Sequence, residues 1–228
     1  MCLRRKVKLD EALNAYRGQL ANMQRLVAVD RSNMQWQRDL SISYIKVGDV
    51  LMDEDKLDEA IAAYRDSLAI CERLVATDNS NTLWESDLSL SYGRVGDVLK
   101  AQGKLDEALK AYRDALAITE RLAASDHGNM GWQRTLSVSN DKVGNVLLAQ
   151  GKLGEALKAY RDSLAIRERL VAADRSNTLW QREAMPNWRR CTNRKAGLLM
   201  PCRSWPKGAT SWQRLWPSRP AMHDGKKI

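Results

Sequence analysis

The segment that decides the fold is residues 95–122, VGDVLKAQGKLDEALKAYRDALAITERL, because the chain repeats it. Leu57, Leu105 and Leu153 each open a run with the pattern L-(D/G)-E-A-(I/L)-x-A-Y-R-D-(S/A)-L-A-I, and a looser copy, LDEALNAYRGQL, begins at Leu9. The four starting leucines are equally spaced along the chain. A fixed period of about 48 residues is typical of proteins built from stacked structural repeats.

The period divides the chain into three parts. We expect an irregular start at 1–8, a repeat array at 9–182 and a tail at 183–228. Within the array we place the unit boundaries as follows: 9–56, 57–104, 105–152 and a partial unit at 153–182. The chain begins on the second half of a unit, so we expect an upstream part to be missing.

Each unit is expected to form two helices. Apolar residues recur at spacings of three and four in both halves of a unit, which predicts one apolar stripe on each helix. Gly103 is typical of a helix C-terminus, and the stretch from Thr77 to Asn81 is rich in residues that turn the chain and cap a following helix. No proline occurs before Pro186, so none interrupts a helix of the array. The predicted helices are 9–29, 34–53, 57–77, 82–101, 105–125, 130–149 and 153–173.

These elements predict an all-α fold, an α-solenoid of antiparallel helix pairs stacked into a superhelix. The spaced small and large residues resemble the tetratricopeptide repeat family; in one unit they are Tyr92, Val95-Gly96, Leu99, Gly103, Ala108, Tyr112 and Ala115. The family's usual period is shorter, at about 34 residues, and its proline after the second helix is absent here. Longer helices account for both departures, and the pattern is similar to that of kinesin light chain and of many bacterial repeat proteins.

The resemblance implies that a partner peptide or helix binds in a concave groove lined by the first helix of each unit. The implied positions are Ile42, Ile45, Lys46, Asp49, Leu90, Gly93, Arg94, Asp97, Val138, Asp141, Lys142 and Asn145. A cation recurs at three of them and could bind a carboxylate of the partner. The alternative is a solvated cation, or an ion pair within one helix such as Lys46 with Asp49.

The tail has a different composition from the array. It contains ten of the 37 Lys and Arg residues, all five prolines and half of the tryptophans, and it accounts for most of the net charge of +9. One interpretation is a disordered basic tail. The other is a frameshift near Arg182, because the shifted reading frame gives another repeat. Since the charge lies there, we do not expect nucleic-acid binding by the array, although four tryptophans among basic residues could imitate a stacking platform.

The sequence contains no arrangement typical of catalysis or metal binding. Its acids and bases recur with every unit, whereas an active site needs one asymmetric cluster. His127 falls in a turn between units, where we expect it to be solvated, and Cys71 is interpreted as a surface thiol. No paired cysteine spacing, leader segment or long apolar run is present. We therefore expect a non-enzymatic cytoplasmic protein without cofactor, metal or membrane contact.

The function that we expect is that of a protein–protein interaction scaffold. Because the array shows no polar capping unit, we also expect self-association through its uncapped ends. Two alternatives remain open. The chain could be a recognition fragment of a larger signalling NTPase or protease, or a truncated product without function.

Overall fold

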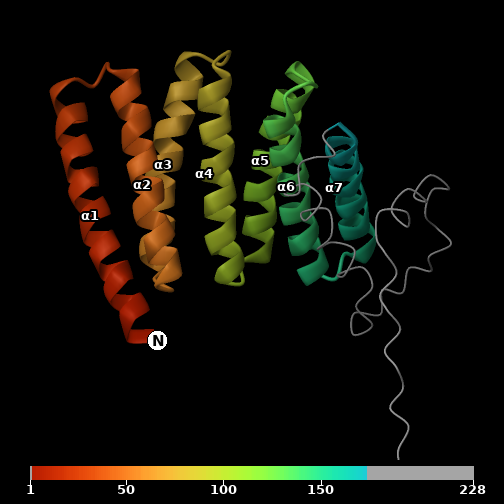
Figure 1. The fold of residues 1–228 in the computed structure, drawn as a ribbon, viewed down its shortest axis with the longest axis horizontal. Helices are drawn as coiled ribbons and strands as arrows, with labels where there is room; N and C mark the ends of the chain where they lie inside the picture. Colours follow the sequence, from red (N-terminus) through yellow and green to blue (C-terminus); the bar gives the residue numbers. More distant parts are fainter. Residues whose placement is uncertain (1, 174–228) are drawn as a thin grey trace, which may run out of the picture. The chain divides into compact units, whose positions relative to one another are not determined.

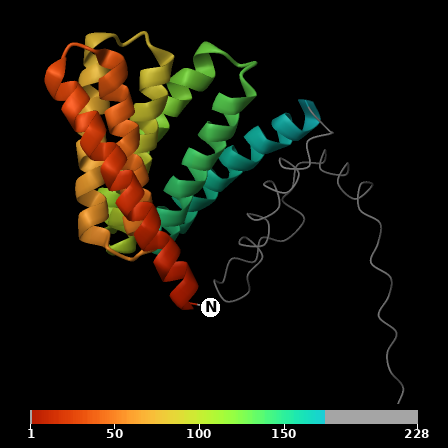
Figure 2. The same cartoon turned by 60° about the vertical axis from the view of Figure 1, so that its left-hand side comes forward.

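The computed structural model describes residues 2–173, which form seven helices and contain no strand (Figure 1). The bounds are α1 (Cys2–Val29), α2 (Met34–Asp53), α3 (Leu57–Thr77), α4 (Thr82–Ala101), α5 (Leu105–Ser125), α6 (Met130–Ala149) and α7 (Leu153–Ala173). Each helix packs against its neighbours in the chain, so the described part is a helical solenoid (Figures 1 and 2). We call α2, α4 and α6 the first helices and α1, α3, α5 and α7 the second helices. From here on, a unit is a first helix together with the second helix that follows it.

The helix bounds predicted from the sequence are observed from residue 34 onward. The irregular start expected at 1–8 is wrong, because α1 begins at Cys2. Residues 2–8 are Cys, Leu, Arg, Arg, Lys, Val and Lys, and without Gly or Pro nothing interrupts a helix there. The tail at 183–228 and the frameshift interpretation lie outside the described residues.

An asparagine side chain caps each first helix. The Asn33 side-chain oxygen accepts a hydrogen bond from the Trp36 backbone N–H at 3.0 Å, and Asn129 accepts from Trp132 at 3.1 Å. Asn81 accepts from both Leu83 and Trp84, at 3.1 and 3.2 Å. These bonds satisfy N–H groups that have no partner within the helix, which explains why each first helix begins where it does.

The first helices end in a left-handed residue. Gly103 and Gly151 have φ angles of 76° and 75°, and Asp55 takes the same place in the first unit with a φ of 60°. The next backbone N–H returns to the helix, for example from Lys104 to the Leu99 carbonyl at 2.9 Å. This arrangement turns the chain within three residues, so the second helix packs antiparallel on the first.

In each unit, a glycine of the first helix packs against a tyrosine ring of the second helix. A Cβ atom on Gly96 would lie 2.7 Å from a ring carbon of Tyr112, and the same holds for Gly48 under Tyr64 at 2.5 Å. Tyr64 and Tyr112 are 1% and 2% exposed. The absence of a side chain on the first helix therefore sets how closely the two helices of a unit approach.

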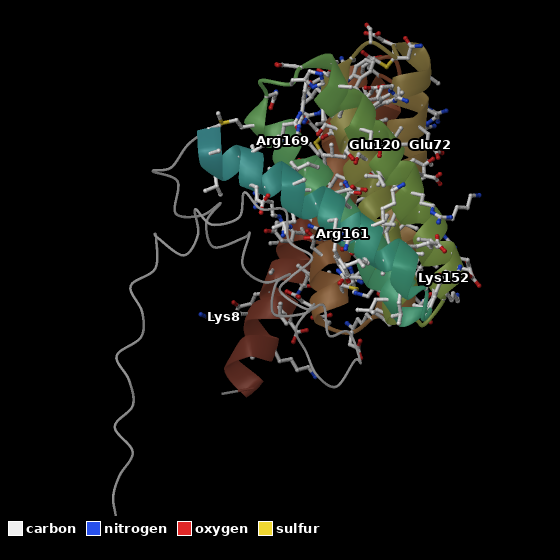
Figure 3. All side chains as sticks on the ribbon, turned by 90° about the vertical axis from the view of Figure 1, so that its right-hand side faces the viewer. Lys8, Glu72, Glu120, Lys152, Arg161 and Arg169 are labelled. Carbon is white, nitrogen blue, oxygen red and sulfur yellow. The ribbon has the colours of Figure 1, made fainter. Side chains whose placement is uncertain are left out.

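The core is continuous along the array. One cluster of buried aliphatic and tyrosine side chains extends from Leu13 on α1 to Tyr160 on α7. Buried serines line the first helices beside it; Ser91 donates to the Asp87 carbonyl of its own helix, and Ser89 donates to the Ala115 carbonyl on α5. Charged side chains such as Glu72, Glu120 and Arg169 project from the second helices into solvent (Figure 3).

Candidate functional site

The twelve positions predicted to bind a partner lie on the three first helices in four equivalent rows. The rows are Ile42, Leu90 and Val138; Ile45, Gly93 and Asp141; Lys46, Arg94 and Lys142; and Asp49, Asp97 and Asn145. First helices of successive units meet directly, since α2 approaches α4. The rows therefore run across the units, from one first helix to the next.

Asp49 and Asp97, the two acids of the fourth row, each bind one side chain of the second helix of their unit and one of the next first helix. Asp49 accepts a hydrogen bond from the Tyr64 hydroxyl at 2.6 Å and from the Arg94 guanidinium at 3.2 Å. Asp97 accepts from the Tyr112 hydroxyl at 2.7 Å and from Lys142 Nζ at 2.8 Å. Each acid thus joins the second helix of its own unit to the first helix of the next. We call these contacts the inter-unit ladder.

In the last unit of the inter-unit ladder, a neutral residue replaces the acid. Asn145 takes the place of the acid in the last of these units, and its side-chain oxygen accepts from the Tyr160 hydroxyl at 2.9 Å. At the other end, Lys46 Nζ lies 5.8 Å from the centre of the Tyr16 ring, a cation–π contact. Lys142 makes a similar contact with Tyr112 at 5.4 Å.

The ladder changes the role expected for the cations. Arg94 and Lys142 are bound to acids of the preceding unit rather than pointing freely at a partner. The alternative of an ion pair within one helix is also not the main contact, since Arg94 lies 4.0 Å from Asp97 but 3.2 Å from Asp49. These side chains are about a third exposed, so each pair stabilises the array by roughly 0–1 kcal/mol.

Burial and the hydrogen bonds to acids raise the pKa values of the tyrosines Tyr64 and Tyr112 in the inter-unit ladder. Loss of water around the phenol, reinforced by the adjacent Asp49, raises the pKa of Tyr64 far above its usual value of 10.0. Burial and the charge of Asp97 raise the pKa of Tyr112 in the same way. Both phenols therefore stay protonated and donate to their acids throughout the physiological pH range.

The second helices carry a buried slot that holds Cys71, Thr119 or Arg167 in successive units. The interpretation of Cys71 as a surface thiol is wrong, because its side chain is 0% exposed and its Sγ lies 3.6 Å from Ser91 Oγ. Burial raises the pKa of this thiol, which makes it poorly reactive. The slot looked exposed from the sequence because one unit fills it with arginine.

The arginine in that slot has a carboxylate to match it. Arg167 is 8% exposed, its guanidinium forms an ion pair with Asp141, and its Nε lies 3.4 Å from Ser137 Oγ. The equivalent residues are Ile45 with Cys71 in the first unit, and Gly93 with Thr119 in the second. The third unit therefore differs from the other two at both positions. The Asp141 carboxylate forms an ion pair within the array.

The first row is the apolar part of this surface. Ile42 and Val138 are half-buried, and Leu90 is 46% exposed. Next to Leu90 in the following row is Gly93, which has no side chain; a Cβ there would meet only Lys142 Nζ, at 3.5 Å. The middle unit therefore presents the most accessible apolar group of the row.

Two contacts of the array were not predicted from the sequence. Arg38 on α2 forms an ion pair with Asp87 on α4 at 2.5 Å, and Arg121 on α5 forms one with the buried Glu85 at 2.5 Å. Serine stands at the equivalent of Arg38 in the second unit, and glutamine stands at both equivalents of Glu85, so comparison of the units carries no clear signal for these pairs. The tyrosine–acid contacts do carry one, because a constant separation of 15 residues joins Tyr64 to Asp49 and Tyr112 to Asp97.

The described residues contain no group of three or more potential metal ligands from His, Cys, Asp and Glu. His127 is exposed in the turn after α5, as expected, with its Nδ1 3.0 Å from the Ala123 carbonyl oxygen. Within the same part of the chain, no helix combines the length and the apolar character that a membrane span requires.

The chain is similar to several solved structures, of which that of BtubC supports the fold. The crystal structure of BtubC (BKLC) from P. vanneervenii aligns with a TM-score of 0.55 at 14% identity, over 96% of this chain and 98% of that chain. A Podosopora anserina protein of nearly identical kinesin light chain TPR-like repeats aligns with a TM-score of 0.44 at 16% identity, over 84% and 96%. MamA aligns with a TM-score of 0.40 at 18% identity, over 73% and 92%.

No curated protein sequence matches the chain. The family profile described as tetratricopeptide repeat matches three times, at residues 42–80, 89–129 and 141–175. Together these matches cover just over half of the chain, and each runs from a first helix into the second helix of the same unit. The chain belongs to the tetratricopeptide repeat family, whose members are generally non-catalytic and bind protein partners.

Proposed function

We propose that this protein is an interaction scaffold that binds a partner peptide or helix across α2, α4 and α6. The observation that carries the proposal is the row formed by Ile42, Leu90 and Val138, one apolar side chain per unit on three successive first helices. A partner that follows the row would meet an apolar contact on each helix in turn. A few well-packed contacts that are shielded from water near the centre of an interface supply most of its affinity.

The inter-unit ladder supports this proposal by fixing the spacing of the row. Asp49 and Asp97 hold the first helices of neighbouring units in one register. Because Arg94 and Lys142 are already bound to these acids, the partner's carboxylates gain little by displacing them. We therefore propose that the ladder positions the binding surface and that the apolar row contacts the partner.

The experiment uses the full chain, and its probe is a displayed library of random peptides long enough to cross all three first helices. Enriched peptides are resynthesised, and their affinities are measured by fluorescence anisotropy for the wild type and for Leu90→Glu. The matched control is Leu83→Glu, because Leu83 lies on the same helix, is 50% exposed and is outside the row.

We expect Leu90→Glu to weaken binding of the selected peptides at least tenfold, whereas Leu83→Glu leaves it within about twofold. Equal affinities for wild type and Leu90→Glu would place the binding surface elsewhere. A library without any enriched peptide would contradict a peptide-binding function for this face.

The proposal includes a reducing cytoplasmic setting. Cys71 is a free thiol buried between helices, at a position that tolerates no oxidation without loss of packing. Fractionation of cells that express the tagged chain tests this point, and recovery in a secreted fraction would refute it.

A further inference from the structure

The outward face of α1 is a second candidate for interaction, and it does not involve the proposed partner-binding row. α1 carries two series of residues at alternating spacings of three and four. The first series is packed against α2 and consists of Leu9, Leu13, Tyr16, Leu20, Met23 and Val27. The second series, which we call the outer seam, consists of Ala12, Ala15, Gln19, Asn22, Leu26 and Val29.

Apart from Ala12, which is half-buried beside the core cluster, the outer seam is open to solvent. α1 lies at the end of the row of described helices (Figure 1) and packs mainly against α2. Leu26 is 41% exposed and Val29 is 84% exposed, while Gln19 and Asn22 are also exposed. Leu26 and Val29, three residues apart, therefore form an apolar patch on one helix face that the other described residues leave exposed.

The sister helices show what normally covers this face. In α3 the equivalent residues Ile70 and Leu74 are 4% and 1% exposed and pack with Leu40 on the first helix of the same unit. In α5, Ile118 and Leu122 pack with Leu88 on α4 in the same way. A first helix therefore covers the equivalent of the outer seam in both of these units.

The outer seam does not fit an ordinary first helix. Gln19 stands where the sister helices have the buried small residues Ser67, Ala115 and Ser163, and Asn22 stands where they have Ile70, Ile118 and Ile166. The longer Gln19 would overfill its position. The Asn22 amide would be buried against an apolar surface without a partner.

A second copy of α1 does fit. When two α1 helices pack antiparallel about a two-fold axis, large residues meet small ones: Val29 lies opposite Ala12 of the second copy, and Leu26 lies opposite Ala15. The same register places Gln19 opposite Asn22, so the two amides can form hydrogen bonds with each other across the axis. Polar layers of this kind select one register and orientation of a helix pair.

We propose that the protein forms a homodimer through the outer seam, with two α1 helices packed antiparallel in this register. The seam runs from residue 12 to residue 29, about 26 Å at 1.5 Å per residue. A single helix pair of this length is smaller than a standard stable interface. The dimer is therefore weak, with a dissociation constant of about 10–100 μM.

The test is sedimentation velocity of the full 228-residue chain at concentrations from about 2 to 200 μM, a range that spans the expected dissociation constant. The wild type is compared with Leu26→Glu and with Val29→Glu, whose side chain is so exposed that folding is unaffected. Leu83→Glu, another exposed leucine, is the matched control. Helix content by circular dichroism verifies that each variant is folded.

We expect the wild type and Leu83→Glu to dimerise with increasing concentration, and both α1 variants to dissociate at least tenfold more readily. A wild type that stays monomeric up to about 200 μM, or an oligomer that both α1 variants leave unchanged, overturns the proposal. Peptide binding by the Leu90 surface should not change in the α1 variants, so failure of either proposal is distinguishable from failure of the other.

Disulfide cross-linking tests the register. In a background with Cys2, Cys191 and Cys202 replaced by serine, a chain with Ala12→Cys is mixed with a chain with Val29→Cys. Oxidation should cross-link the two chains to each other, and Val29→Cys alone should give little dimer. Efficient cross-linking of Val29→Cys to itself would indicate a parallel pair and contradict the proposed dimer.

Discussion

At the scale of single residues, the closest packing in the array is that of a first-helix glycine against a tyrosine ring, as with Gly96 and Tyr112. A methyl group on Gly96 would lie 2.7 Å from the ring, which is buried and cannot move aside. We expect Gly96→Ala to lower the free energy of unfolding by about 1–3 kcal/mol, measured by urea denaturation. Gly18→Ala is the control, since nothing lies within 4 Å of that position.

Gly18→Ala should instead stabilise the protein by about 0.5–1 kcal/mol, because alanine is the better residue inside a helix. If both substitutions shift stability in the same direction, the close approach of Gly96 to Tyr112 is not what limits packing between α4 and α5.

The buried pair of Asp141 and Arg167 makes a second residue-scale prediction. Asp141→Ile removes the carboxylate that forms the ion pair with Arg167. Because Arg167 is only 8% exposed, water compensates its charge poorly, and we expect a loss of about 3–5 kcal/mol in the free energy of unfolding. Adding Arg167→Cys reproduces the Ile45 and Cys71 pair of the first unit and should recover most of that loss. The measurement is a double-mutant cycle by urea denaturation, and simple additivity of the two effects would refute the coupling.

At this scale, the sequence indicated the packing role of the first-helix glycine but not the burial of Cys71. The spacing of Gly96 and Tyr112 recurs in every unit, so a shared packing role could be inferred. The slot of Cys71 holds thiol, hydroxyl and guanidinium groups in turn. That variety looked like exposure, but it reflects compensation by Asp141 on a facing helix, which only the structure brings next to Arg167.

At the scale of the helices, their ends could be predicted because the signals are local. Asn81 lies three residues before Trp84, and Gly103 has the left-handed backbone that ends α4. The inter-unit ladder could not be predicted as readily. It joins residues 45 positions apart, such as Asp49 and Arg94, and which positions meet depends on how one unit stacks on the next.

The cap of α4 gives a prediction for one helix. Asn81→Ala removes an oxygen that accepts from two backbone N–H groups at the start of α4. We expect the free energy of unfolding to fall by about 1 kcal/mol, measured by thermal or urea denaturation. Asn79→Ala, in the same turn but exposed, should change it by less than about 0.5 kcal/mol. Equal effects of the two substitutions would argue against a capping role.

The contacts between helices through tyrosine predict an alkaline limit to stability. Burial and the adjacent acids raise the pKa of Tyr64 and Tyr112 in the folded chain well above the value of 10.0 that applies when the chain is unfolded. The unfolded state therefore releases these protons first, and stability falls as the pH rises above about 10. Below that pH the contribution is fully present.

Absorbance in the near ultraviolet, where the phenolate absorbs, measures this effect during an alkaline titration. We expect Tyr64 and Tyr112 to ionise only when the chain unfolds, and the variant with Tyr64→Phe to lose stability less steeply above pH 10.0. Ionisation of all tyrosines near pH 10.0 in a folded chain would show that the ladder phenols are not protected.

At the scale of the whole molecule, stability is distributed along the array rather than held in one core. A unit of a repeat array contacts only its neighbours, so a helix covered on two sides opens less often than a helix covered on one. α3 packs against both α2 and α4, whereas α1 packs mainly against α2. The proposed α1 dimer would supply the missing second side, but only at high protein concentration.

Hydrogen exchange followed by mass spectrometry can measure this distribution directly. At low micromolar concentration we expect amides of α1 to exchange at least tenfold faster than those of α3 and α5. At concentrations where the dimer forms, protection of α1 should increase while that of α3 stays the same. The Leu26→Glu variant, which presents a charge on the outer seam, should lose the concentration dependence and keep the difference between helices. If α1 is as protected as α3 in the dilute wild type, the outer seam is already covered, and both the exposed face and the dimer built on it are incorrect.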